Sequence, residues 1–194
     1  MRNMIKYLGT TNADKANIVE RIGEYGYIVG GAKAVGGSYN FTLVRLNLCG
    51  EVIWTKIYNE GLYGYPAGIV FKDDTIYISM YYDTPNKTAT LKIDLDGNIL
   101  EGNLFGTRNT YPRRILETND GNFIITGVTD DRGGVGENDF YLVKTVPDGS
   151  FLWKKQFGGS SNDYAHNITE ASDGSIIVVG YTRNYIVGIH RGLI

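Results

Sequence analysis

The sequence predicts an all-β protein built from four copies of one four-strand unit. Three observations support this. Short runs rich in Val, Ile, Tyr, Phe and Thr alternate apolar with polar residues, the same order of runs and turns recurs along the chain, and no stretch of twelve residues keeps a helical period. The chain has 194 residues, which corresponds to one domain. Glycine accounts for 26 residues and proline for only 4, a composition typical of a turn-rich globular chain.

Two segments show the repeated unit most clearly, residues 27–56 and 123–155. Each has an apolar run that ends in glycine, then a second apolar run, then a glycine four residues before a tryptophan, which is Trp54 or Trp153. A weaker copy follows the first and has Glu101 at the tryptophan position, and a partial copy begins at Ile176. The chain therefore contains three complete units and part of a fourth.

The spacing of the units predicts a closed ring. The first strand of successive units starts at equivalent residues spaced 50, 46 and 53 apart, which are Lys15, Tyr65, Tyr111 and Tyr164. Residues 4–9 match residues 153–158, which belong to the fourth strand of a unit. We therefore predict that an N-terminal strand completes the last unit. Counted around the ring, the distance from Tyr164 back to Lys15 is then 45 residues, an ordinary unit length.

Such a ring of radial sheets is a β-propeller. We predict a four-bladed β-propeller with four antiparallel strands per blade, in which the N-terminal strand closes the last blade. Residues 1–194 form a single domain, with blades at about residues 16–59, 65–106, 112–158, and 165–191 together with 2–9. Closure within one chain predicts a monomer. The alternative is a homodimer, in which two chains pair into a larger, eight-bladed ring.

Particular motifs resemble known repeat families. Residues 46–54 look like the tryptophan-docking repeat of quinoprotein-type propellers. The longer unit is similar to a bacterial and archaeal β-propeller repeat family, on the motifs Gly158-Gly159, Asp163-Tyr164-Ala165, Asp173-Gly174 and Ile177-Val178-Val179-Gly180. The resemblance implies the fold but no single function, since these families include scaffolds, binding modules and enzymes. Glu101 and Met4 stand where a docking tryptophan is expected, and no quinone or other cofactor is inferred.

Composition excludes several classes of partner. Lys and Arg number 19 against 21 Asp and Glu, a net charge of −2, whereas nucleic-acid binders are usually basic. No run of 18 apolar residues exists, so we expect no membrane partner. The first residues lack the apolar core of a signal peptide, so the protein is expected to be cytoplasmic, or secreted with a leader removed. Cys49 is the single cysteine, which excludes an intrachain disulfide and a cysteine-based zinc site.

The turns sort into two faces of the predicted ring. Asp-Gly pairs, which favour tight hairpins, recur on one face at residues 96–97, 120–121, 148–149 and 173–174. We call the opposite face the long-loop face. It consists of residues 9–15, 33–39, 59–65, 82–88, 105–111, 129–138, 158–164 and 182–185. Long loops on a rigid scaffold commonly carry binding sites, so we expect a ligand there.

The candidate ligand-binding residues lie on the long-loop face and at the mouth of the central channel. They are Lys15, Tyr65, Tyr111, Arg113, Arg114, Tyr164, His166 and Asn167. Tyrosine offers a flat contact surface with a hydroxyl group, and the four residues Arg113, Arg114, His166 and Asn167 could converge on an anion. Other interpretations remain open: the repeated tyrosines fit packing between blades, and the four polar residues fit solvated strand ends.

No catalytic residue, metal site or cofactor is predicted. Glu117 and Glu170 occupy equivalent positions, and we interpret them as acceptors for backbone donors of the neighbouring blade rather than as a catalytic pair. The sequence thus favours a non-enzymatic binding or scaffold module for a protein or a small polar or glycan ligand. Two alternatives stay open, a carbohydrate-binding propeller and a hydrolase or lyase at the channel mouth with His166 or Glu170 as general base.

Overall fold

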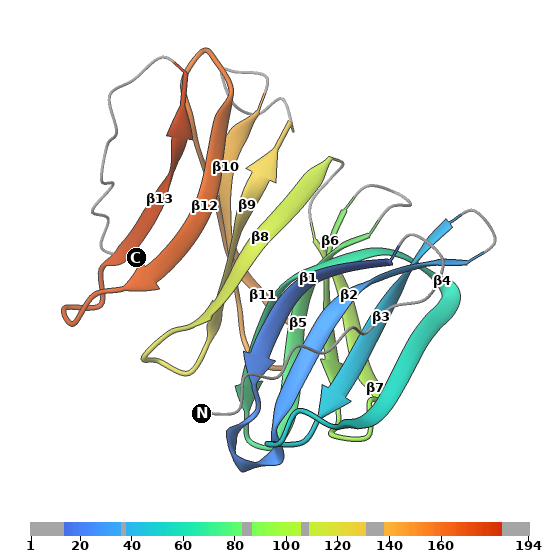
Figure 1. Ribbon diagram of the computed structural model, residues 1–194. Coiled ribbons are helices and arrows are strands. Elements are labelled where there is room, and N and C mark those ends of the chain that lie inside the picture. Colours follow the sequence, from blue (N-terminus) through green and yellow to red (C-terminus); the bar gives the residue numbers. More distant parts are fainter. Residues whose placement is uncertain (1–13, 36–37, 83–86, 106–108, 131–137, 184–194) are drawn as a thin grey trace.

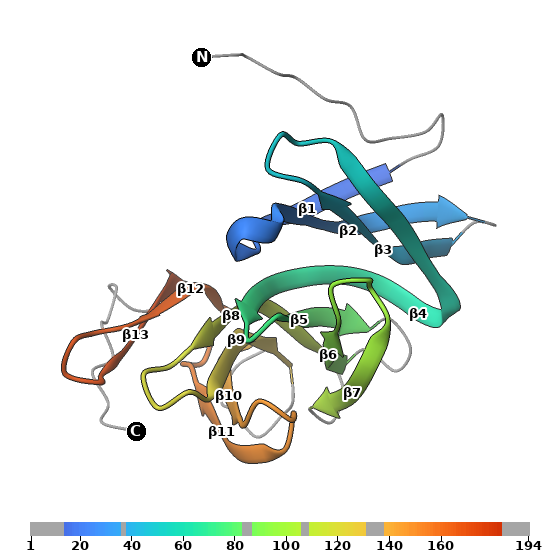
Figure 2. The ribbon, with the colours of Figure 1, turned by 90° about the horizontal axis from the view of Figure 1, so that it is seen from below.

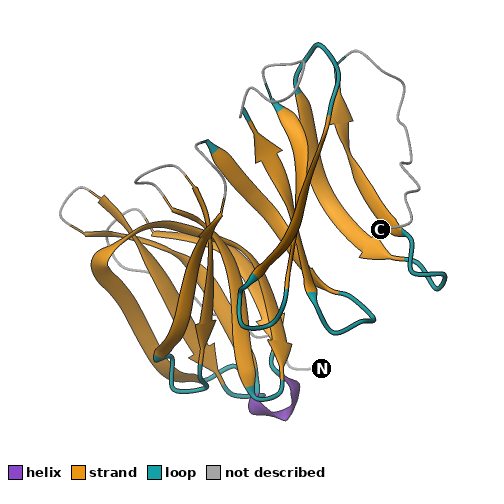
Figure 3. Cartoon of the chain, turned by 180° about the vertical axis from the view of Figure 1, so that it is seen from behind, coloured by secondary structure: helices purple, strands orange, loops and turns teal. Residues whose placement is uncertain are grey.

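The computed structural model describes residues 14–35, 38–82, 87–105, 109–130 and 138–183 (Figure 1). Over these residues the protein is all-β, as predicted. The exception is a single turn of 3₁₀ helix, η1, at Gly23–Tyr25, and no α-helix occurs in the described ranges (Figure 3).

The strands form four antiparallel sheets, which we call sheets 1 to 4. Sheet 1 contains β1 (Asp14–Arg21), β2 (Tyr27–Val35), β3 (Ser38–Leu46) and the first half of β4 (Val52–Lys72). Sheet 2 contains the second half of β4, β5 (Thr75–Tyr82), β6 (Lys87–Ile93) and β7 (Ile99–Phe105). Sheet 3 contains β8 (Thr110–Glu117), β9 (Phe123–Thr129), β10 (Asp139–Thr145) and β11 (Phe151–Phe157). Sheet 4 contains β12 (Asp163–Glu170) and β13 (Ile176–Thr182).

The hydrogen-bond register confirms that the four sheets repeat one design. In each sheet the first strand has an irregularity at the same place, which falls between Ala16 and Ile18, Pro66 and Gly68, Pro112 and Arg114, or Ala165 and Asn167. A bulge of this kind bends the strand and re-aims the side chains beside it. β4 runs from sheet 1 into sheet 2 without a break, so β1 to β7 form one continuous hydrogen-bonded series.

The predicted Asp-Gly turns are confirmed. Gly97, Gly121, Gly149 and Gly174 have φ angles of 77°, 79°, 83° and 81°. In each turn the glycine N–H donates to the carbonyl three residues earlier, as Gly97 N does to Asp94 O at 3.0 Å. A positive φ costs glycine little, and this explains why glycine recurs at these positions.

The sheets pack face against face, with an apolar layer between each successive pair. Ile28 and Phe41 of sheet 1 share a cluster with Ile78 of sheet 2. Between sheets 3 and 4, Ile124 meets Ile168. Along the array β1 packs beside β4, β4 beside β8 and β8 beside β12 (Figure 2).

The described strands do not form a closed ring. β12 does not pack against β1 as the other successive first strands do, and sheets 1 and 4 lie at opposite ends of the array (Figures 1 and 2). Residues 2–9, which we expect to close the last blade, lie outside the described residues. Ring closure therefore stays a prediction.

Candidate functional site

Three stacked tyrosines occupy the long-loop face between sheets 2 and 3. The ring centroids of Tyr65 and Tyr81 are 5.4 Å apart, and those of Tyr81 and Tyr111 are 5.0 Å apart. Tyr81 is buried, whereas Tyr65 is 37 % exposed. Two of the predicted site residues are thus brought together through Tyr81, which sequence reasoning did not select. The sequence could have indicated Tyr81, because the antiparallel pairing of β4 with β5 places Tyr81 directly opposite Tyr65.

Two further members of the predicted set, Tyr164 and Lys15, pack in separate places. The Tyr164 ring stacks on Tyr181 with centroids 6.3 Å apart. Lys15 Nζ lies 4.3 Å from the centre of the Tyr39 ring. Each of these contacts joins the first strand of a sheet to a residue of the second or third strand of the same sheet. The tyrosines therefore serve local packing and still present part of their surface to solvent.

Four polar residues flank the bulges of β8 and β12. Arg113 and Arg114 lie in β8, His166 and Asn167 lie in β12, and all four are exposed. Asn167 Oδ1 accepts a hydrogen bond from Ile168 N at 3.0 Å. Within the described ranges, neither arginine nor His166 has an ion-pair partner. The charges of the two arginines are therefore available to a ligand, although no hydrogen bond or ion pair joins the four side chains to one another.

The two equivalent glutamates each contact the preceding sheet. Glu117 forms an ion pair with Lys72 at 2.7 Å, and the hydrogen bond to Glu117 raises the pKa of Lys72. Glu170 accepts a hydrogen bond from Asn119 N at 2.6 Å. The interpretation that such carboxylates satisfy backbone donors of the neighbouring sheet is confirmed for Glu170 and is wrong for Glu117, which pairs with a side chain. The two carboxylates are engaged with different partners on two different sheets.

Buried hydrogen bonds between neighbouring sheets stabilise the strand ends next to the long-loop face. Thr110 Oγ1 accepts a hydrogen bond from Thr88 N at 2.8 Å. The Thr88 hydroxyl is hydrogen-bonded to the Tyr141 hydroxyl, and burial raises the pKa of Tyr141. Between sheets 3 and 4, Asp163 accepts a hydrogen bond from Gly159 N at 2.7 Å, which fixes that connection. No group of three or more His, Cys, Asp or Glu residues suited to a metal ion occurs among the described residues.

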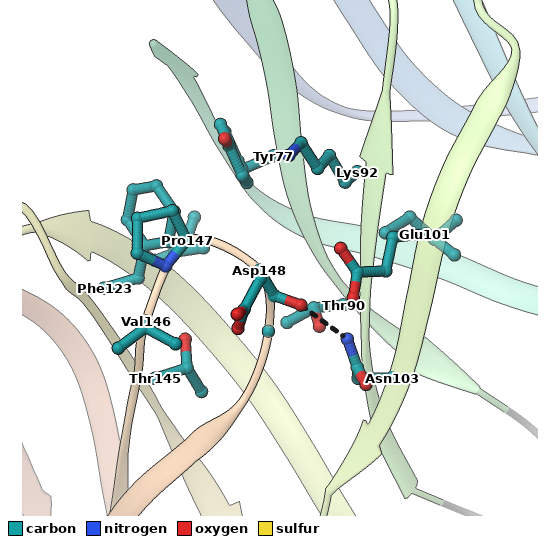
Figure 4. A pocket seen from close by; sticks show the side chains of 13 residues that line it. Tyr77, Thr90, Lys92, Glu101, Asn103, Phe123, Thr145, Val146, Pro147 and Asp148 are labelled. Carbon is teal, nitrogen blue, oxygen red and sulfur yellow. Dashed lines mark hydrogen bonds between the residues drawn. The ribbon is translucent and has the colours of Figure 1, made fainter. Parts of the chain in front are cut away.

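A crevice between sheets 2 and 3 was not predicted (Figure 4). In sheet 1 the Trp54 indole docks on the next sheet, where Nε1 donates to Leu95 O at 3.0 Å. Trp153 likewise packs against the cluster between sheets 3 and 4. At the equivalent place Glu101 faces the turn at Pro147 and Asp148, and the space an indole would fill is the crevice. The sequence feature that indicates this crevice is Glu101, which stands where the repeat otherwise has a tryptophan.

Replacing Glu101 with tryptophan should therefore stabilise the protein. The indole should fill the crevice and stack over the β10–β11 turn as Trp54 stacks over Gly97. We expect the free energy of unfolding to rise by about 1 kcal/mol, the usual gain from filling a cavity. Urea denaturation measures the change. Glu101→Ala is the control, since it removes the carboxylate and fills nothing, and a tryptophan variant no more stable than this control would contradict the assignment.

Comparison with known proteins identifies one solved structure with a similar fold but assigns the chain to no family. No family model matches the chain, and no curated protein matches it. A solved structure of a protein of unknown function from Bacteroides caccae matches with a TM-score of 0.52 and 14 % sequence identity, over 85 % of this chain and 53 % of that one. This chain thus spans about half the length of that protein, and the likeness concerns the fold alone. Across the described residues, no helix is long and apolar enough to span a membrane.

Proposed function

We propose that the chain is a non-enzymatic binding module of the β-propeller type, whose four sheets are the blades. The long-loop face and the exposed starts of the first strands form the binding surface. The ligand class we favour is an acidic segment of a partner protein. One observation carries the proposal. Arg113 and Arg114 are exposed without ion-pair partners in the described chain, and both closely follow in β8 the Tyr111 that packs on Tyr81.

The tyrosine stack makes this surface suitable for binding. Tyr81 is buried between its two neighbours, so Tyr65 and Tyr111 are held in place before any partner arrives. Rigid aromatic side chains lose little conformational entropy on binding, and the cost of association falls accordingly. The cations add attraction for carboxylates, because charge-assisted hydrogen bonds from arginine to carboxylate are among the stronger polar contacts.

The proposal can be tested with peptides selected from a displayed random library against the wild-type protein. The selected peptides should be rich in Asp and Glu, and their dissociation constants are then measured by calorimetry. The double variant Arg113→Ala/Arg114→Ala should bind them at least about tenfold more weakly, since a loss of 1.4 kcal/mol is tenfold. Lys154→Ala, an exposed cation on β11 of the same sheet, is the matched control and should bind normally.

Two outcomes would count against the proposal. Equal affinity of the double variant and the control would remove the arginines from the site. A glycan array in parallel separates the carbohydrate alternative: binding to neutral sugars but not to acidic peptides would replace the proposed ligand class. The aromatic residues that recur at the strand starts are the feature that such sugars would use.

A further inference from the structure

The front face of sheet 1 is uncovered at its β1 edge. In each sheet we call the face that packs on the preceding sheet its front and the opposite face its back. Val19 of β1 has the same register position as Ile69 of β4 and Ile168 of β12. Those two isoleucines are 5 % and 7 % exposed, because each packs on the sheet before it, whereas Val19 is 61 % exposed. Val44 of β3, in the same row of residues, is 9 % exposed, so the uncovered part of this apolar face lies along β1.

The back face of sheet 4 is uncovered in the same way. Val179 and Tyr181 of β13 are each 49 % exposed. The residues at their register positions in β9, Thr126 and Val128, are buried beneath the following sheet. The array therefore has one uncovered face at each end. Each of these faces is one half of the front-to-back interface that successive sheets form three times within the chain.

Polar contacts occur at two of the three interfaces, whereas at the first interface the equivalent residue, Phe71, packs against Tyr25 of sheet 1. The last residue of the first strand contacts the turn region of the preceding sheet, as Glu117 does with Lys72 and Glu170 does with Asn119 N. Arg21 holds this position in β1 and is exposed. The corresponding turn of sheet 4 carries Asp173, also exposed. Arg21 Nε donates to Gly23 O at 3.1 Å and Asp173 accepts a hydrogen bond from Ser175 N at 2.9 Å, so both side chains are held within their own sheets. The two end faces thus carry opposite charges.

We propose that a second copy of this chain covers both faces. The front of sheet 1 in one copy packs on the back of sheet 4 in the other, with Arg21 of one copy facing Asp173 of the other. A two-fold axis produces this contact twice and closes a ring of eight sheets, with no exposed end face. Continuity favours this occupant, because each new interface repeats the front-to-back packing already present between sheets 1 and 2, 2 and 3, and 3 and 4.

Exchange of the two charges tests the proposal. Arg21→Glu and Asp173→Lys are prepared as separate full-length chains, and sedimentation equilibrium measures the dimerisation constant of each. Each variant alone places like charges at both interfaces, so its dimer should be at least about tenfold weaker than the wild-type dimer. An equimolar mixture of the two should regain most of the lost affinity. Each mixed dimer has one interface with the natural charges and one with both charges reversed.

Two results would overturn the proposal: a wild-type chain that stays monomeric, as closure within one chain requires, or a mixture no tighter than its components. Val19→Ser and Val179→Ser test the apolar part of the same contact, and each should weaken the dimer. Val52→Ser is their control. Its register equivalents Ile99 and Phe151 stay exposed in sheets 2 and 3, so this position is not covered by sheet packing. Equal dimer strength in all three serine variants would likewise refute the interface. Circular dichroism verifies that each variant is folded.

Discussion

Replacement of Gly127 with alanine should lower the free energy of unfolding by about 3 kcal/mol, the upper part of the range for overpacked sites. A Cβ atom at Gly127 would lie well inside the van der Waals radius of Tyr111 O, 2.5 Å from Tyr141 Cε1 and 2.9 Å from Pro112 Cα. Two of these obstacles are backbone atoms of β8, which cannot move without breaking the ladder with β9. Glycine is therefore required here by the close approach of two strands.

Gly102→Ala is the matched control. It also lies in a strand, β7, but a Cβ there would lie 3.2 Å from the flexible end of Leu91 and at an ordinary contact distance of 3.8 Å from Thr90 O. Urea denaturation of both variants should show a large loss for Gly127 and a change of about 0.5 kcal/mol or less for Gly102, as is usual for surface substitutions. Similar losses in the two variants would contradict the steric explanation.

Tyr141→Ala should cost about 4 kcal/mol, within the range for truncating a large buried aromatic residue. Tyr141 is 1 % exposed and belongs to the core cluster that Ile125 and Phe105 share between sheets 2 and 3. Its hydroxyl is hydrogen-bonded to the Thr88 hydroxyl across that junction. The alanine variant leaves a cavity and deprives Thr88 of this partner, and thermal or urea unfolding measures the combined loss.

Tyr141→Phe separates the two contributions. Phenylalanine keeps the ring and removes only the hydroxyl, so its cost should be about 1 kcal/mol, the usual value for one hydrogen bond. Tyr65→Ala is the comparison on the long-loop face and should cost much less than Tyr141→Ala, because Tyr65 is more than a third exposed. A phenylalanine variant as unstable as the alanine variant would show that the hydroxyl, and not the ring, holds sheets 2 and 3 together.

The repeated architecture could be predicted because its signals are local. Period-two alternation identifies strands and Asp-Gly pairs identify tight turns, and both patterns depend on residues close together in the chain. The structure confirms the turns at Gly97 and Gly149. The equivalent bulges beside Pro66 and Pro112 were not predicted and are known only from the strand register. The same alignment of units also located Glu101 at the tryptophan position, and the missing indole is the local signal from which the crevice could have been predicted.

The candidate site was harder to predict because it depends on contacts between sheets. Tyr65 and Tyr111 recur by alignment, but their connection through Tyr81 depends on how sheet 3 packs against sheet 2. The exposure of Val19 also has no local signal, since its sequence surroundings resemble those of the buried Ile168. What covers a sheet face is decided by distant parts of the chain, or by another chain.

The mass of the wild-type protein in solution tests the central claim most directly. One chain weighs 21.5 kDa, and light scattering over a series of concentrations measures the mass of the particle. If a second copy covers both end faces, the particle should contain two chains. No larger species should form as the concentration rises, because the closed ring leaves no end face exposed. A mass of one chain at every concentration would contradict the account and would favour closure within a single chain.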